Sequence, residues 1–158
     1  MSKVFNGQKT ARMEGDFVVF LIGMRFNKLW KVWKWWPVVM AMPRMLTELS
    51  KDPDSGLLSF STWNTWRNVM VVQYWRSWEE LHDYAYAREK AHLPAWQAFN
   101  KAVGGDGDVG IWHETYLVKA GQYENVYGNM PRSGLGVAGT LVDAAGNLRW
   151  AKGRMGED

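Results

Sequence analysis

The sequence contains no cysteine among its 158 residues. Disulfides, thiolate metal ligands and cysteine nucleophiles are therefore excluded. Histidine is also scarce, and the three imidazoles His82, His92 and His113 form no H-x-x-x-H pair or His-carboxylate cluster at helical ligand spacing. We therefore expect no non-haem metal site.

Signals for export, nucleic acid and phosphate are missing as well. No apolar run near the N-terminus leads to a small-residue cleavage site, so we expect a cytoplasmic protein. A net charge of +3 is too small to indicate a nucleic-acid partner. The glycines of residues 104–107 lack the lysine and Ser/Thr of a P-loop, and no G-x-S-x-G element indicates a serine hydrolase.

Tryptophan, in contrast, is abundant, with 11 residues in a chain that is 15% aromatic. Indole combines a large apolar area with an N–H that needs a partner, and it is common in ligand pockets and at interfaces. The composition therefore favours a pocket or a dimer interface. A bulky, Trp-rich core remains the alternative.

Residues 28–36 (KLWKVWKWW) alternate cations with aromatic side chains. Such a segment can lie at a membrane interface or stack on bases. Its three lysines exclude a bilayer-spanning helix, because the apolar stretches beside them are far shorter than about 18 residues. We expect lysine stems to cover the Trp surface, and we expect no membrane contact.

The chain has the length of one domain. We predict an N-terminal arm over residues 1–15, a core domain over residues 16–130 and a C-terminal flap or tail over residues 131–158. Residues 1–15 are polar without a clear period, and the composition after residue 130 turns to Gly, Pro and small residues.

The core domain shows alternating strand and helix patterns. Strands are predicted over residues 16–26, 57–62, 68–75 and 109–118, and helices over residues 36–50 and 77–103. Pro37 suits the first turn of the first helix, while Ser77 and Glu80 form a capping box for the second. Short additional strands are expected over residues 122–127 and 147–150. The order β-α-β-β-α-β predicts an α+β, ferredoxin-like sandwich.

A ferredoxin-like sheet has helices on one face, and its other apolar face must also be covered. Face-to-face association of two copies is the usual solution, so we expect a homodimer of the dimeric α+β barrel kind. A pocket for a small hydrophobic substrate is then expected between sheet and helices. Residues 128–139 are predicted to fold over its mouth, from where Arg132 can reach a ligand.

Several polar groups lie among the aromatic residues and are candidates for chemistry. Alternation places Ile111 and His113 on one face of the last strand and Trp112 and Tyr116 on the other. In an apolar pocket an imidazole can act as a general base, a hydrogen-bond donor or an axial ligand. Either His113 or His92 could instead be a satisfied core residue.

Two groups of motifs carry a family resemblance. Residues 73–81 (QYWRSWEEL), with His92 farther along the helix, resemble the strand-to-helix signature of antibiotic-biosynthesis-type monooxygenases and other dimeric α+β barrel proteins. Residues 109–116 (VGIWHETY), 121–124 (GQYE) and 127–131 (YGNMP) resemble a monooxygenase-like subfamily, formerly a domain of unknown function, with a relative in fungal terpenoid (fumagillin-type) biosynthesis. Together the matches span residues 16–140.

The resemblance implies a dimer of ferredoxin-like domains and oxygen insertion into a small apolar compound, in some members without metal or flavin. The expected catalytic residues are His113 and His92. The expected substrate-binding residues are Arg25, Trp75, Trp96, Trp112, Tyr116, Tyr127 and Arg132.

Two alternatives stay open. Haem-binding relatives on this fold carry a histidine on the second helix and a Trp on the third strand, which His92 and Trp75 match. A haem-degrading or aldoxime-dehydratase-like enzyme with His92 or His113 on the iron is therefore the second hypothesis. The third is a non-catalytic module that holds an apolar ligand.

Overall fold

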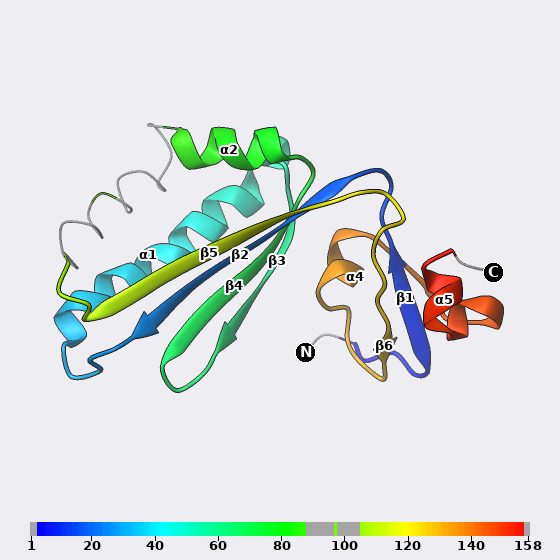
Figure 1. The fold of residues 1–158 in the computed structure, drawn as a ribbon, viewed down its shortest axis with the longest axis horizontal. Helices are drawn as coiled ribbons and strands as arrows, with labels where there is room; N and C mark the ends of the chain where they lie inside the picture. Colours follow the sequence, from blue (N-terminus) through cyan, green and yellow to red (C-terminus); the bar gives the residue numbers. More distant parts are fainter. Residues whose placement is uncertain (1–2, 88–96, 98–104, 157–158) are drawn as a thin grey trace.

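The computed structural model describes residues 3–87, 97 and 105–156 (Figure 1). Its larger part is a four-stranded antiparallel sheet in the order β3-β4-β2-β5. The strands are β2 (Phe17–Phe26), β3 (Leu57–Asn64), β4 (Asn68–Trp75) and β5 (Val109–Val118). With α1 (Val32–Lys51) after β2 and α2 (Trp78–Tyr86) after β4, the order is β-α-β-β-α-β. The predicted ferredoxin-like α+β fold is confirmed.

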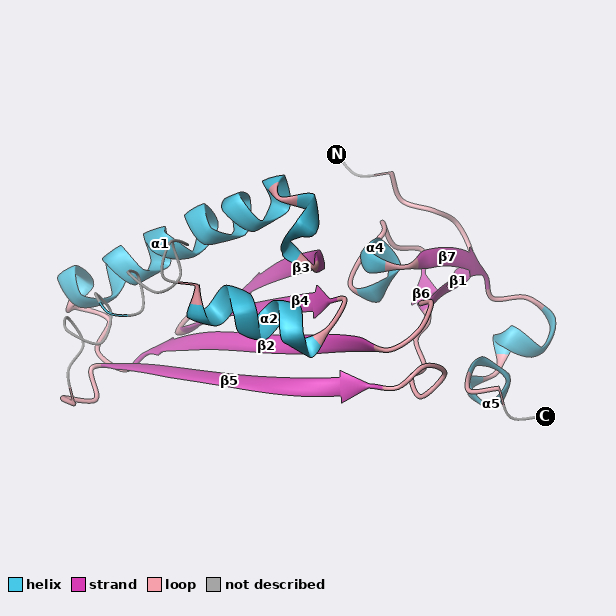
Figure 2. Cartoon of the chain, turned by 90° about the horizontal axis from the view of Figure 1, so that it is seen from above, coloured by secondary structure: helices cyan, strands magenta, loops and turns pink. Residues whose placement is uncertain are grey.

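The centre of the sheet is β2, which pairs along its length with β4 on one side and β5 on the other. Its sequence, FVVFLIGMRF, is rich in β-branched and aromatic residues, which suit a strand buried on both faces. Both helices cover the same face of the sheet (Figure 2). Val18, Met24 and Phe26 of β2 are buried beneath them.

The first helix begins four residues earlier than predicted and contains both Pro37 and Pro43. The Trp35 indole N–H donates to the Leu29 carbonyl oxygen at 3.0 Å and secures the entering loop. Pro37 therefore lies beyond the first turn, where it removes one helical hydrogen bond.

The predicted cap of the second helix is confirmed. The Glu80 backbone N–H donates to the Ser77 hydroxyl oxygen at 3.1 Å. The helix, however, ends at Tyr86, and Ala87 caps it in an extended conformation. The rest of the helix predicted up to residue 103 lies outside the described residues, apart from Gln97.

The three lysines of residues 28–36 converge on one carboxylate. The ammonium groups of Lys28, Lys31 and Lys34 lie 2.7, 2.5 and 2.9 Å from carboxylate oxygens of Asp108, which is fully buried. Their hydrogen bonds hold the pKa of Asp108 well below its ordinary value. The loop before α1 is thereby tied to the start of β5.

The ammonium groups of these lysines supply the counter-charges that the buried Asp108 carboxylate needs. Trp30 and Trp33 remain 67% and 68% exposed. Among the described residues, no helix is both long and apolar enough to cross a membrane.

A second, three-stranded sheet brings the two ends of the chain together (Figure 1). Its order is β6 (Tyr127–Gly128), β1 (Gln8–Arg12) and β7 (Thr140–Asp143). The short helix α4 (Leu135–Ala138) lies between β6 and β7 in sequence, and η2 (Gly146–Arg149) and α5 (Ala151–Arg154) follow. Residues 8–12 of the predicted arm are thus a strand paired within the chain, and residues 146–149 form a 3-10 turn rather than an edge strand.

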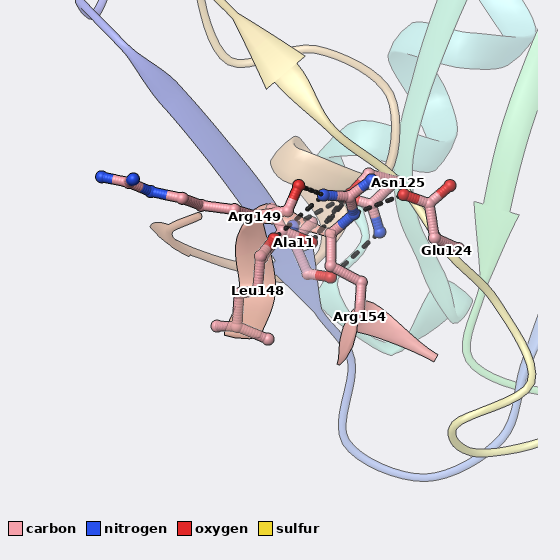
Figure 3. Close-up of polar contacts among 7 residues, drawn as sticks. Ala11, Glu124, Asn125, Leu148, Arg149 and Arg154 are labelled. Atoms are coloured by element: carbon pink, nitrogen blue, oxygen red, sulfur yellow. Dashed lines mark hydrogen bonds and ion pairs between the residues drawn. The ribbon is translucent and has the colours of Figure 1, made fainter. Parts of the chain in front are cut away.

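Side chains secure this terminal part (Figure 3). The Asn125 amide imitates a strand partner, accepting from the Ala11 N–H at 2.7 Å and donating to the Ala11 carbonyl at 3.0 Å. The Arg154 guanidinium pairs with Glu124 and donates to the Leu148 and Arg149 carbonyl oxygens at 2.9 and 2.8 Å. The expected strand over residues 122–127 is therefore replaced by a side-chain bridge, and pairing with β1 begins at Tyr127.

The terminal sheet packs on the helix-free face of the main sheet, near the start of β2. Phe17 meets Ala11 and Leu135 in one buried cluster. The Phe17 ring makes an edge-to-face contact with Tyr123 at 5.2 Å between centroids. Part of the helix-free face is therefore covered within a single chain.

Candidate active site

An apolar cavity of about 90 Å³ lies between the main sheet and the helices α1 and α2. Since a cavity needs roughly 10–15 Å³ on this scale to hold one water, the space accommodates a ligand of several heavy atoms. Helices and strands both line it. The lining residues are Phe20, Ile22, Val38, Ala41, Met42, Met45, Leu46, Leu49, Gln73, Trp75, Leu81, Tyr84, Ala85 and Ile111.

Regular side-chain spacing builds this wall. Lining positions on α1 recur at steps of three and four residues, so they form one stripe along the helix. On the strands, Phe20 and Ile22, like Gln73 and Trp75, are two residues apart and therefore share the helix-facing side. The fold thus lays an apolar stripe over an apolar sheet face.

A second hollow of about 450 Å³ lies beside the first, under α1 and over β3. Met42 and Leu46 line both spaces. Met side chains are unbranched and adaptable, so Met42 can change the boundary between the two spaces at small cost. Together the spaces fall in the range of about 300–1,000 Å³ typical of small-molecule sites.

The polar feature of the cavity wall is a pair of side chains on β4. The Trp75 indole N–H donates to the Gln73 amide oxygen at 2.8 Å. Trp75 is fully buried and Gln73 is 5% exposed. Because the surroundings are apolar, this hydrogen bond is protected from exchange with water and fixes both side chains.

Tyr84 adds a hydroxyl from α2. Its ring lies 5.9 Å from that of Trp75. Burial, with the charge of Glu48 as a smaller cause, raises the pKa of Tyr84 to about 12. The phenol is therefore protonated at neutral pH and cannot serve as a base there.

The predicted site residues divide between the two faces of the main sheet. Trp75 lines the cavity. His113 lies on the same face, with its ring 5.8 Å from that of Phe20, but it is exposed at the edge strand and does not line the cavity. His92 and Trp96 lie outside the described residues.

Three other predicted residues lie on the helix-free face. Arg25 points to the opposite face of β2 from Met24 and Phe26, which pack beneath α1. Trp112 lies over Gly23, where an added Cβ would come within 2.5 Å of the indole. The Tyr116 hydroxyl donates to the Glu114 carboxylate at 2.6 Å. The structure does not bring these residues into the cavity.

The predicted flap also lies away from the cavity. Residues 128–139 carry α4, and Leu135 is buried against Ala11 and Phe17 on the helix-free side. Tyr127 belongs to this cluster, and its hydroxyl accepts from the Gly136 N–H at 3.2 Å. Arg132 is exposed on the same segment. The flap prediction is wrong because the terminal sheet gives the apolar residues of this segment a place to pack.

Comparison with known proteins agrees with this architecture. The family model described as "Monooxygenase af470-like" matches residues 17–135, three quarters of the chain. The chain belongs to this family. The af470-like chain is 26% identical over 196 aligned residues to Monooxygenase af470 of Aspergillus fumigatus, covering 100% of this chain and 69% of that protein.

Two solved structures are similar to this chain. Aldoxime dehydratase has a TM-score of 0.51 at 14% identity, covering 84% of this chain and 42% of that one, and shows a shared fold. SnoaB, a cofactor-independent oxygenase from Streptomyces nogalater, has a TM-score of 0.47 at 12% identity, covering 66% of this chain and 94% of that one.

The described residues of the af470-like chain do not fit a haem. No imidazole is among the described lining residues of the cavity or of the hollow beside it. His113 is the candidate iron ligand among the described residues, and it is exposed on the edge strand β5, with its ring 5.8 Å from that of Phe20. Within the described ranges, no group of three or more His, Asp or Glu side chains could hold a metal ion.

Gln73 and Tyr84 are the polar lining residues that the predicted site omitted. The alternation Val71-Gln73-Trp75 contained a signal for Gln73, because it places an amide on the same face as buried apolar side chains. No comparable pattern marks Tyr84, whose surroundings depend on how α2 docks on the sheet.

Proposed function

We propose that this chain is a monooxygenase-like enzyme acting on a small hydrophobic metabolite in the cavity under α1 and α2. The supporting observation is an apolar cavity whose wall carries a fixed amide, Gln73. Membership of the monooxygenase af470-like family supports the reaction class.

A substrate that reacts with O₂ without a bound cofactor must itself supply all four electrons that reduce the two oxygen atoms. In the simplest balanced reaction an activated CH₂ group and O₂ give a C=O group and water. One oxygen atom forms the carbonyl, and the other leaves with both hydrogens. Removal of the first proton gives a carbanion that can reduce O₂, and a water-poor site protects this anion from reprotonation.

His113 is our candidate for the base. It lies on the helix-facing side of β5, two residues from Ile111 and in ring contact with Phe20, both of which line the cavity. An exposed imidazole can accept a proton from a substrate and exchange it with solvent after each turnover. His92 and Trp96 stay predictions, while Arg25, Trp112 and Tyr116 have no role in this proposal.

The test is oxygen consumption with a panel of phenolic and terpenoid compounds, comparing two substitutions on α1. Ala41→Phe fills the cavity, whereas Met40→Phe places the same ring at a neighbouring, 43% exposed position. We expect Ala41→Phe to abolish substrate-dependent oxygen uptake and Met40→Phe to retain it. Equal activity of both variants would move the reaction away from this cavity.

Three further measurements test the candidate base and separate the alternatives. His113→Ala should lower turnover without lowering the melting temperature, because the side chain is exposed. Tight binding without oxygen uptake for any compound would favour a non-catalytic module. A Soret band in protein purified with haem available would favour the haem enzyme instead.

A further inference from the structure

The orientation of the Gln73 amide is decided by its partner. An indole N–H can only donate a hydrogen bond, so the group it meets at 2.8 Å must be the amide oxygen. The choice between oxygen and nitrogen, which electron density leaves ambiguous for many amides, is settled here by chemistry. The NH₂ group therefore points away from the Trp75 nitrogen.

This NH₂ group has two donors and little access to bulk water. Gln73 is 5% exposed, and the residues around it in the cavity wall are mostly apolar. Within the part of the chain that the structure describes, no oxygen accepts a hydrogen bond from the Gln73 nitrogen. In the wall of a cavity, such a donor is open to a ligand or a water molecule that can accept from it.

The remaining cavity wall narrows the chemistry of that ligand. No lysine or arginine is among the described lining residues, so a carboxylate or phosphate would be buried without a counter-charge. The wall therefore suits an apolar molecule with one uncharged acceptor oxygen.

We propose that the Gln73 NH₂ group is the substrate-positioning donor of this cavity, and that the ligand is an apolar molecule with a carbonyl-type oxygen. Trp75 is a positioning residue that holds the amide in the donating orientation. The proposal rests on the cavity being the substrate site, as in the proposed function. It adds the class of substrate and the atom that recognises it.

A matched pair of probes tests the proposal. Acetophenone and α-methylstyrene have nearly the same shape, but the first has a carbonyl oxygen where the second has a CH₂ group. Calorimetry or ligand-detected NMR gives both Kd values in each protein. The quantity compared is the ratio of the Kd for α-methylstyrene to that for acetophenone, and comparing it between variants cancels the different hydration of the probes.

We expect Gln73→Leu to lower this ratio about tenfold, the effect of losing one hydrogen bond of ordinary strength. The affinity for α-methylstyrene should stay the same or rise. Trp75→Phe should lower the ratio by a smaller factor, because the freed amide can turn its oxygen to the ligand. Met45→Leu, a change in apolar lining, should shift both Kd values equally. Circular dichroism checks the fold of each variant, with Gln73→Met as a second apolar replacement.

An unchanged ratio in folded Gln73→Leu or Gln73→Met would overturn the proposal, as would failure of the wild-type protein to bind acetophenone at millimolar concentration. Failure of the proposed function looks different. A protein that shows the Gln73-dependent ratio but consumes no oxygen keeps the binding assignment and loses the enzymatic one. A protein that consumes oxygen but shows an unchanged ratio keeps the enzymatic assignment and loses the binding assignment of Gln73.

Discussion

The hydrogen bond between Trp75 and Gln73 predicts a measurable coupling in stability. In Trp75→Phe the Gln73 amide oxygen stays buried without a donor, which costs about 1–3 kcal/mol. The smaller ring also leaves a void, and a void of roughly 40 Å³ adds about 1 kcal/mol. We therefore expect Trp75→Phe to lower the free energy of unfolding by about 2–4 kcal/mol.

The double variant distinguishes the hydrogen bond from general packing. Gln73→Leu leaves the Trp75 N–H unpaired and should cost about 1–3 kcal/mol by itself. In the double variant neither polar group is left alone, so its cost should fall short of the sum by about 1–2 kcal/mol. Urea unfolding measures all four proteins, and domains with stabilities of about 5–15 kcal/mol tolerate these losses.

The neighbouring strand offers a matched control. The Trp63 indole N–H donates to the Ser61 hydroxyl oxygen at 3.1 Å, with the same two-residue spacing, but Trp63 is 57% exposed. Trp63→Phe should cost less than about 0.5 kcal/mol, because water replaces the lost partner. Additive effects of the Trp75 and Gln73 substitutions, within about 0.5 kcal/mol, would refute the reasoning.

Three further predictions concern other parts of the chain. Asp108→Asn should lower the melting temperature at pH 7. Because the pKa of Asp108 is depressed in the folded protein, the wild type should lose its higher melting temperature as the pH falls below the carboxyl's ordinary pKa of 3.8, and a melting-temperature difference that stays constant from pH 7 to 3 would contradict this. The pKa of Tyr84 is raised to about 12 from the ordinary 10.0, so the phenol does not reduce the free energy of unfolding below pH 10 but reduces it as the pH rises through 12. Tyr84→Phe should make this alkaline loss smaller, and an unchanged dependence of stability on alkaline pH would count against the prediction. We predict a homodimer through the free part of the helix-free face, where Trp112 is 39% exposed. Light scattering should give twice the monomer mass and Trp112→Glu should lower it, whereas a wild-type monomer at micromolar concentration would contradict the prediction.

Much of the ferredoxin-like core follows from local sequence. The strand over residues 109–118 has the predicted bounds, and β2 and β4 agree with theirs to within one residue. Their β-branched and aromatic runs end at turn residues, so pattern and boundary coincide. The Ser77 cap is equally local, since both partners lie within one helical turn.

The site was only partly predictable. Alternation correctly separates Ile111 and His113 from Trp112 and Tyr116. It does not say which set faces the helices, because that depends on the side of the sheet on which α1 docks. The cavity itself arises between elements distant in sequence, so its lining could not be read from any one of them.

The sequence by itself determined the order of strands and helices in the core, because hydrophobic period, capping residues and turns act over a few neighbours. Tertiary structure alone decided the contacts between distant residues. Thr10 pairs with Val142 in the terminal sheet, and Asp108 forms ion pairs with Lys28 and Lys31, which lie about 80 positions earlier in the sequence. Such contacts depend on burial and charge compensation that exist only once the chain is folded, which is why local patterns did not reveal the terminal sheet or the place of residues 128–139.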